Sequence, residues 1–310
     1  MTGCLVTGAS GFLGRRLVPI LAGLGHEVAV VSRTPVEGVR TFLGDLTGEF
    51  NLSGANCSQL YHLAGLAHLV PRSEREGRRF FEVNVEGTRN LLRRLDLAGE
   101  VPRSAVLVST VSVYGLESGE LLDEDTPRRA TDPYGASKAA AEDLVREWGD
   151  RRGVRVGVVR LPLVVGRDAP GNFGAMVQAL RGGRYFGIGS GTARRSMVLV
   201  DDAARALYEV AASGGVFHLT DGRHPSFAEI EKAIASGLGR RSPGHLPLWA
   251  GKLAARVGDL AEHVTRFRMP LNSRTLAKMT TTLTFSDQKA RRALGWNPRS
   301  VVDCIPGILA

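Results

Sequence analysis

Short apolar runs alternate with stretches of helical periodicity along the first half of the chain. An apolar run bounded by polar or glycine positions is typical of a strand buried in a parallel sheet, and apolar residues recurring at helical spacing indicate a helix. The expected strands are Gly3–Thr7, Glu27–Ser32, Arg40–Leu43, Gln59–Leu63, Ala105–Ser109 and Val154–Arg160. The expected helices are Phe12–Leu24, Arg75–Ala98, Tyr134–Arg152 and Met176–Arg181. This alternation predicts a parallel sheet with crossover helices.

After Arg160 the alternation loosens, and Gly and Pro become more frequent. One strand-like run, Gly215–Leu219, is expected to return to the sheet. Further helices are expected at Ser226–Leu238, Leu248–Val264 and Ser286–Leu294. The pattern predicts an α/β fold with a doubly wound parallel sheet over residues 1–162 and a smaller lobe made mostly of residues 163–310.

Composition narrows the class of protein. The chain has 310 residues, 43% of them hydrophobic, which is enough to bury a large core. No apolar stretch approaches the ~18–20 residues that span a bilayer, so no membrane partner is expected. The first strand begins within five residues of Met1, which leaves no room for a signal peptide. Cys4, Cys57 and Cys304 are scattered without a C-x-x-C pair. This arrangement predicts neither disulfides nor a metal site. It also predicts a cytoplasmic location.

The formal net charge is +9. Proteins that bind nucleic acids usually gather their basic residues in one patch or stripe. Here the arginines form short pairs along the whole chain without interleaved aromatic residues: Arg15-Arg16, Arg93-Arg94, Arg128-Arg129, Arg194-Arg195 and Arg291-Arg292. A nucleic-acid partner is therefore not expected, whereas small anionic ligands such as phosphates suit this positive potential.

Glycines at three-residue spacing follow the first expected strand directly. Gly8, Gly11 and Gly14 form a G-x-x-G-x-x-G pattern that leads into the first expected helix, in which Pro19 lowers the expected regularity. Such glycines allow a tight turn and let the backbone approach a pyrophosphate at the helix N-terminus. The alternative is a glycine-rich strand–helix turn without a ligand.

Tyr134 and Lys138 are four residues apart, just after the turn at Pro133. At helical spacing they lie on one face, where a cation can favour the phenolate and lower a tyrosine pKa that is otherwise near ~10. This arrangement suits general acid–base chemistry. By itself the spacing also fits a solvated helix face, and the upstream glycine pattern favours the chemical interpretation.

Seven segments occur in an order typical of one superfamily. They are Thr7–Gly14, Gly44–Leu46, His62–Gly65, Asn84–Thr88, Ser109–Gly115, Tyr134 with Lys138, and Arg160–Gly166. Together they resemble the extended short-chain dehydrogenase/reductase superfamily over nearly the whole chain. The resemblance implies a Rossmann-type NAD(P)-binding domain, a substrate-binding C-terminal lobe and a homodimer.

The resemblance also implies roles for individual residues. Tyr134 would be the general acid/base, Lys138 would bind the cofactor ribose and lower the pKa of Tyr134, and Thr110 would orient the reacting oxygen. The implied cofactor-binding residues are Gly8, Ser10, Gly11, Phe12, Leu13, Gly14, Arg33, Asp45, Leu46, Leu63, Ala64, Gly65, Asn84, Tyr134 and Lys138. The implied substrate-binding residues are Thr110, Ser112, Tyr134, Asn172 and Arg195. Alternatives remain for Asp45, as a turn residue at a strand end, and for Ser112, as a buried strand hydroxyl.

The end of the second expected strand bears on the choice of cofactor. NAD-binding folds usually carry an acidic residue there, which binds the ribose 2′-hydroxyl. This chain has Ser32-Arg33 instead, and Glu27 falls at the wrong end of the strand. Arg33 is placed to meet a 2′-phosphate, so NADP is favoured over NAD. The alternative is that Arg33 stacks near adenine with either cofactor.

The second half points to the substrate. Asn172-Phe173 and the run Arg194–Asp202 resemble segments of nucleotide-sugar enzymes, in which an arginine grips the diphosphate. Arg195 is expected to make that contact, although either arginine of the pair could be a solvated loop charge. Leu163 and Leu199 depart from the pattern of UDP-galactose epimerases, and His68 is either a substrate contact or a surface histidine.

Three functions remain open from the sequence. The first two are a nucleotide-sugar 4-epimerase and an NADPH-dependent 4-keto reductase of such a sugar. The third is a non-catalytic NADP-binding regulator, which the intact Thr110, Tyr134 and Lys138 disfavour. A carbonyl reductase acting on an uncharged non-sugar substrate is a further alternative, and the arginine pair at 194–195 argues against it.

Overall fold

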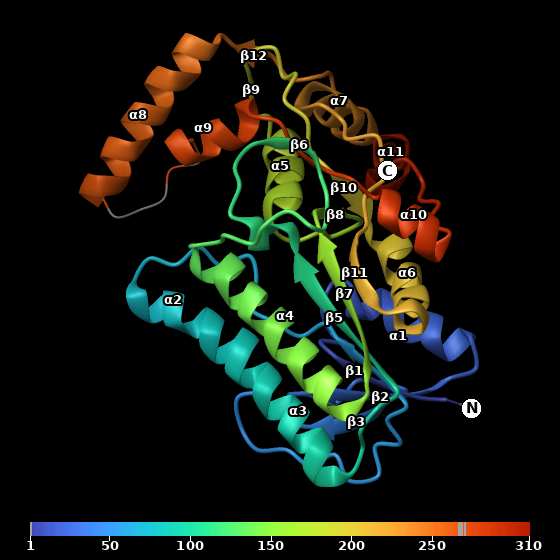
Figure 1. Cartoon of the computed structure of the whole chain (residues 1–310). Coiled ribbons are helices and arrows are strands. Elements are labelled where there is room, and N and C mark those ends of the chain that lie inside the picture. The colour runs from blue at the N-terminus through green and yellow to red at the C-terminus, as the bar shows by residue number, and fades with distance from the viewer. Residues whose placement is uncertain (1, 266–268, 270) are drawn as a thin grey trace.

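The computed structural model describes residues 2–265, 269 and 271–310 and confirms the α/β fold (Figure 1). Seven parallel strands form the central sheet in the order β11-β7-β5-β4-β1-β2-β3. Their bounds are β1 Gly3–Thr7, β2 Glu27–Ser32, β3 Arg40–Leu43, β4 Gln59–His62, β5 Ser104–Thr110, β7 Arg155–Leu161 and β11 Gly215–His218. Each expected strand is present within one residue at either end, including the return strand beside β7. Strands buried on both faces are continuous apolar runs, which explains this agreement.

Helices cover both faces of the sheet (Figure 1). Helix α1 (Gly14–Gly23) packs on α6 (Val200–Ser213), and Leu17 and Leu207 lie in their shared core. On the other face α3 (Gly87–Ala98) packs on α4 (Pro133–Arg152), with Leu91 and Trp148 buried. The sequence patterns missed α6, although Ala203, Leu207 and Val210 give it a buried stripe at helical spacing.

The expected helix Arg75–Ala98 is interrupted. Helix α2 (Glu74–Phe81) ends in a π-helical turn, η1 (Glu82–Glu86), before α3 begins. Apolar periodicity continues through the turn, so hydropathy alone does not reveal it. Such turns interrupt helices at functional sites, and this one carries Asn84.

Outside the central sheet, the chain forms short strand pairs and further helices, and one of these pairs uses a segment from the first 162 residues. Strand β8 (Leu163–Val165) pairs with β10 (Met197–Leu199), β9 (Gly187–Ile188) with β12 (His245–Leu246), and β6 (Gly119–Leu122) with β13 (Leu283–Phe285). The helices are α5 (Gly171–Arg181), α7 (Phe227–Gly237), α8 (Leu248–Thr265), α9 (Ser273–Thr280), α10 (Gln288–Leu294) and α11 (Val301–Leu309). Helices α9 and α11 and these short strands were not expected from the sequence. Among the described residues, no helix is both long and apolar enough to cross a bilayer.

Candidate active site

The glycine turn lies where the order of the strands reverses. Strand β1 lies between β4 and β2, so the loops after β1 and β4 leave the sheet side by side at its carboxyl edge. Gly8 has φ +74°, and a Cβ there would lie 2.6 Å from the amide nitrogen of Ala64. Only glycine therefore lets the two loops approach this closely, and such a crevice is where doubly wound folds bind their ligands.

The first turn of α1 suits a pyrophosphate. Leu13 occupies the N-cap position and makes no side-chain hydrogen bond to the helix. The helix therefore has no capping side chain at its start, which lies beside the exposed residues Ser10 and Gly11. Phosphate binding by these residues stays a prediction.

The loop after β4 forms the opposing wall and is held by a buried histidine. His62 contacts the hydroxyl oxygens of Thr7 at 2.6 Å and Thr88 at 2.8 Å. Burial lowers the pKa of His62 to about 3, so the ring is neutral. The amide of Ala64 donates to the same Thr7 hydroxyl at 3.2 Å, which fixes the backbone of Leu63 to Gly65 beside the glycine turn.

Asn84 connects this loop to α4. Its Oδ1 accepts from the amide of Leu66 at 2.7 Å, and its Nδ2 donates to the carbonyl of Leu66 at 3.1 Å and to the Ser137 hydroxyl at 3.0 Å. The side-chain amide is thus engaged within the protein. Its direct contact with a cofactor stays a prediction, and its observed role is to position the loop.

Tyr134 lies in the first turn of α4. Asp132 caps the helix by accepting from the Gly135 amide at 3.0 Å, and Pro133 begins it. The Tyr134 side chain lies near that of Thr110, the last residue of β5, and its ring lies 5.9 Å from that of Phe80. Burial raises the pKa of Tyr134, and the Thr110 side chain opposes this rise. The structure brings Thr110 and Tyr134 together as the sequence predicted.

Lys138 lies one helical turn further and is buried. Its Nζ would be 3.7 Å from a Cβ placed on Gly65, so the ammonium group lines the wall formed by the loop after β4. Burial lowers the pKa of Lys138 to about 8, although the charge of Glu142 raises it. The predicted lowering of the Tyr134 pKa by Lys138 stays a prediction.

Ser112 does not lie on a strand, so its interpretation as a strand hydroxyl was wrong. Strand β5 ends at Thr110, and Ser112 belongs to a 3-10 turn, Val111–Tyr114. Its amide donates to the Thr110 hydroxyl at 3.2 Å, and that hydroxyl donates to the Ser112 Oγ at 3.2 Å. Ser112 therefore orients Thr110.

Arg33 and Asp45 lie at the same carboxyl edge. Arg33 follows β2 and is exposed. The Asp45 carboxylate accepts from the amide and hydroxyl of Thr47 at 2.9 and 2.7 Å, which makes it a turn residue. The Thr47 hydrogen bonds lower the pKa of Asp45, and the charge of Arg33 contributes. The carbonyl of Leu46 accepts from Asn90 at 2.8 Å, which ties the turn to α3.

Arg195 is a half-buried cation beside a second one. Its guanidinium donates to the carbonyl of Lys278 on α9 at 2.5 Å, and burial lowers its pKa to about 10. Among the described residues it forms no ion pair. Burial and the charges of Arg274 and Arg195 lower the pKa of Lys278, whereas the charges of Glu117 and Asp132 raise it. Lys278 thus lies near Arg195, and no spacing signal in the sequence marks it.

Asn172 is exposed in the first turn of α5. His68 lies against the start of the same helix, where a Cβ on Gly171 would be 2.5 Å from its Nδ1. Burial lowers the pKa of His68. The structure brings His68 and the start of α5 together, and substrate contact by Asn172 stays a prediction.

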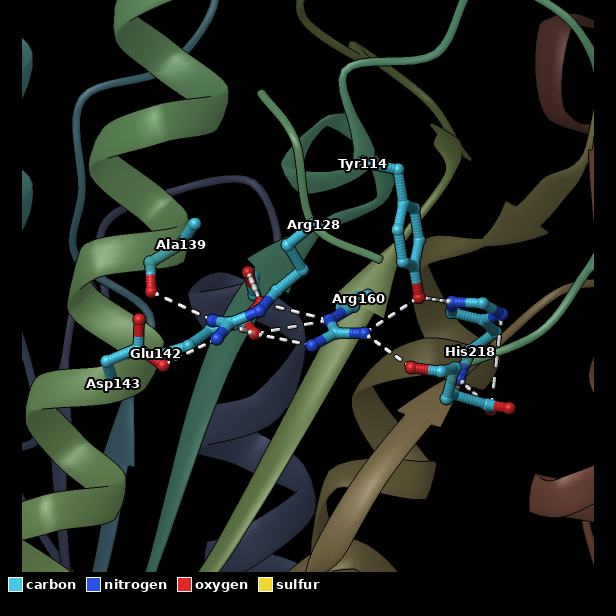
Figure 2. Close-up of polar contacts among 9 residues, drawn as sticks. Tyr114, Arg128, Ala139, Glu142, Asp143, Arg160 and His218 are labelled. Carbon is cyan, nitrogen blue, oxygen red and sulfur yellow. Dashed lines mark hydrogen bonds and ion pairs between the residues drawn. The ribbon is translucent and has the colours of Figure 1, made fainter. Parts of the chain in front are cut away.

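A buried ion pair holds the helix of Tyr134 and Lys138 against the sheet (Figure 2). Glu142, one turn after Lys138, accepts from Arg160 of β7 at 2.8 Å, and these side chains are 0% and 4% exposed. Ser109 of β5 donates to the same carboxylate, as does Arg128 at 3.3 Å. Burial would lower the pKa of Arg160, but Glu142 raises it above its ordinary value.

The network extends through Tyr114 to His218 of β11 (Figure 2). Arg160 donates to the Tyr114 oxygen at 2.8 Å, and that oxygen lies 2.6 Å from His218 Nε2. His218 Nδ1 lies 3.1 Å from the carbonyl of Ser286, which can only accept. Nδ1 therefore carries the proton and Tyr114 donates to Nε2. Burial lowers the pKa of His218 to about 4, in keeping with a neutral ring.

Comparison with known proteins identifies the family to which this chain belongs. The NAD dependent epimerase/dehydratase family matches residues 4–218. The N-acetyl-alpha-D-glucosaminyl-diphospho-ditrans,octacis-undecaprenol 4-epimerase of Escherichia coli O157:H7 is 26% identical over 92% of this chain and 87% of its own. Human 3 beta-hydroxysteroid dehydrogenase type 7 is 31% identical over 95% and 90%. The structure of MoeE5 in complex with UDP-glucose and NAD matches with a TM-score of 0.76 and 27% identity over 99% and 97%. The chain belongs to the NAD dependent epimerase/dehydratase family and is an NAD(P)-dependent enzyme of the extended short-chain dehydrogenase/reductase type.

Replacing Lys138 with methionine should stabilise the protein near neutral pH. The folded state holds a buried ammonium group with a pKa of about 8, below the unfolded value of ~10.4. The charged form is thus disfavoured by up to about 3 kcal/mol at pH 7, and the penalty fades as pH rises from the folded to the unfolded pKa. Urea unfolding of Lys138→Met across this range would show the gain shrinking, whereas the exposed Lys232→Met should show none. A loss of stability at pH 7 would contradict the presence of a buried Lys138 ammonium group with a lowered pKa.

Breaking the Glu142–Arg160 pair from one side should be costly. Glu142→Gln leaves a buried guanidinium without its anion and should lower the free energy of unfolding by about 3–5 kcal/mol. In an Arg160→Met background the same change should cost much less, which a double-mutant cycle measures. The matched surface pair, Glu74 and Arg78, should couple by no more than about 0.5 kcal/mol. Additive effects at Glu142 and Arg160 would show that the pair does not act as a unit.

Proposed function

We propose that this member of the NAD dependent epimerase/dehydratase family carries out oxidoreduction at C4 of a nucleotide-activated sugar, as a 4-epimerase or a 4-keto reductase. The observation that carries the proposal is the half-buried Arg195, which has Lys278 beside it and no ion-pair partner among the described residues. A diphosphate suits a buried guanidinium that has no carboxylate partner. UDP-glucose in MoeE5 and the glycosyl diphosphate named for the E. coli epimerase support this substrate class.

Each of the candidate site residues has a separate part in the proposed oxidoreduction. When bound, a nicotinamide cofactor would accept or supply the hydride. Tyr134 moves the proton at the sugar oxygen, and the Thr110 hydroxyl, oriented by Ser112, hydrogen-bonds that oxygen. Lys138 binds the ribose, and its charge favours the phenolate of Tyr134. The lobe of residues 163–310 supplies the diphosphate contact through Arg195.

A second candidate is oxidoreduction of an uncharged alcohol or ketone. The identity of 31% with human 3 beta-hydroxysteroid dehydrogenase type 7 favours it. The two candidates differ in what Arg195 does, because an uncharged substrate has no use for a desolvated guanidinium.

A substrate panel separates these activities. Purified enzyme is incubated with UDP-sugars, a 4-keto nucleotide sugar and a 3β-hydroxysteroid, each with and without NADPH. C4 inversion without added cofactor identifies an epimerase, and NADPH consumption with the keto sugar alone identifies a reductase. Turnover of the steroid with none of the sugars would reject the sugar proposal. Tyr134→Phe should lower kcat on the order of 10²–10⁴-fold while cofactor binding persists, and near-normal turnover would refute its role.

We further propose that NADP is preferred over NAD, because Arg33 is exposed directly after β2 where a ribose 2′-substituent would lie. Arg33→Ala should weaken NADPH binding about tenfold or more and change NADH binding little, since a charged contact to a phosphate is lost. Fluorescence titration with both cofactors measures this. Arg40→Ala is the matched control, because Arg40 begins β3 and so lies at the amino-terminal ends of the strands. Equal losses for both cofactors would mean that Arg33 stacks on adenine instead.

A further inference from the structure

Helix α8 directs large apolar side chains into solvent. Trp249, Leu253, Val257 and Leu260 recur at intervals of four, four and three residues, which places them along one face of the helix. Their exposed fractions are 71%, 59%, 61% and 66%, respectively. A helix on the surface of a globular protein normally turns such a stripe toward the core. Helix α8 instead exposes its stripe to solvent.

The packing of α8 fixes that orientation. Its inner face carries small residues, Gly251, Ala255 and Gly258, and packs on α9. A Cβ on Gly251 would lie 2.7 Å from the side chain of Ile188. Rotating the helix to bury its large residues would bring them into a contact that has room only for glycine and alanine. The exposure of the stripe is therefore built into the packing of the lobe.

The charges of α8 are sorted in the same way. Lys252 and Arg256 lie beside the stripe, and among the described residues neither forms an ion pair. The acidic residues bond toward the segment before α9, and Asp259 remains exposed. Asp259 accepts from the Ser273 amide at 3.0 Å, and Glu262 accepts from Asn272 Nδ2 at 2.9 Å. The outer surface of α8 is thus apolar with Lys252 and Arg256 beside it, while exposed Asp259 is hydrogen-bonded to Ser273.

We infer that α8 lies flat on an anionic phospholipid bilayer, with Trp249, Leu253, Val257 and Leu260 inserted below the headgroups. Figure 1 shows α8 at the periphery of the molecule, away from the central sheet, where a planar surface can reach it. Lys252 and Arg256 would meet lipid phosphates while their stems cover apolar surface. An anionic surface also offers Lys252 and Arg256 the partners that the described residues of this chain do not supply.

The absence of a spanning segment does not conflict with this inference. The sequence-based expectation of no membrane partner rested on the length of apolar runs. An interfacial helix needs one apolar face with cations beside it and spans nothing. Docking is also independent of the proposed reaction, since it uses no residue of the active site.

Vesicle binding tests the inference on the full-length protein without substrate. Trp148 and Trp296 are buried, so Trp249 is the exposed tryptophan and reports insertion by a blue shift of its emission. The protein should co-sediment with vesicles of phosphatidylglycerol and phosphatidylcholine. Leu253→Ser/Val257→Ser keeps the reporter and should weaken binding about tenfold or more. Lys252→Glu/Arg256→Glu should remove the preference over pure phosphatidylcholine.

Matched variants on other surfaces control for general stickiness and net charge. Leu24→Ser/Leu97→Ser removes two equally exposed apolar side chains, and Arg181→Glu/Lys232→Glu makes the same charge change elsewhere. Both should bind as the wild type does. Wild-type protein that stays in the supernatant, or equal losses in these controls, would overturn the inference. A stripe variant that changes the sedimentation-equilibrium mass but not vesicle binding would assign the stripe to a second copy.

Discussion

The buried pair of Glu142 and Arg160 is the constraint on which the active site depends. Two charges removed from water are tolerated only where their hydrogen-bonding groups are satisfied. Ser109, Arg128 and Tyr114 supply those bonds from three other segments. The pair therefore has one arrangement, and it fixes α4 against β5 and β7. Tyr134 and Lys138 lie on α4, and Thr110 ends β5. The relative positions of these three residues therefore follow from the packing of α4 on β5.

A second constraint sets the width of the cofactor crevice. Gly8 lets the loops after β1 and β4 approach, and the neutral ring of His62 bridges two threonine hydroxyls beneath them. Asn84, carried on the π-helical turn, joins the same loop to α4. The crevice and α4, which carries the candidate catalytic residues, are thereby connected by hydrogen bonds rather than by loop contacts alone.

Helix α9 takes part in two separate features, the contact with Arg195 and the packing against α8. Helix α9 carries Lys278 toward Arg195 and packs against α8. Small residues make that packing close, and the large apolar residues of α8 are left outside. The same α9 thus holds Arg195 through a backbone carbonyl and supports the orientation of the exposed stripe.

Local patterns in the chain were enough to identify the sheet, the glycine turn and the Tyr134–Lys138 spacing. Buried parallel strands are apolar along their whole length, and a turn or a helix face involves residues close in sequence. The π-helical turn at Asn84, the position of Ser112 on a turn and the place of Lys278 beside Arg195 were not accessible in this way. The last contact joins residues 83 positions apart. Likewise, the spacing of the α8 stripe is visible in the sequence, but the packing of Gly251 decides which face is covered. Such features depend on which distant segments meet, and only the folded chain determines that.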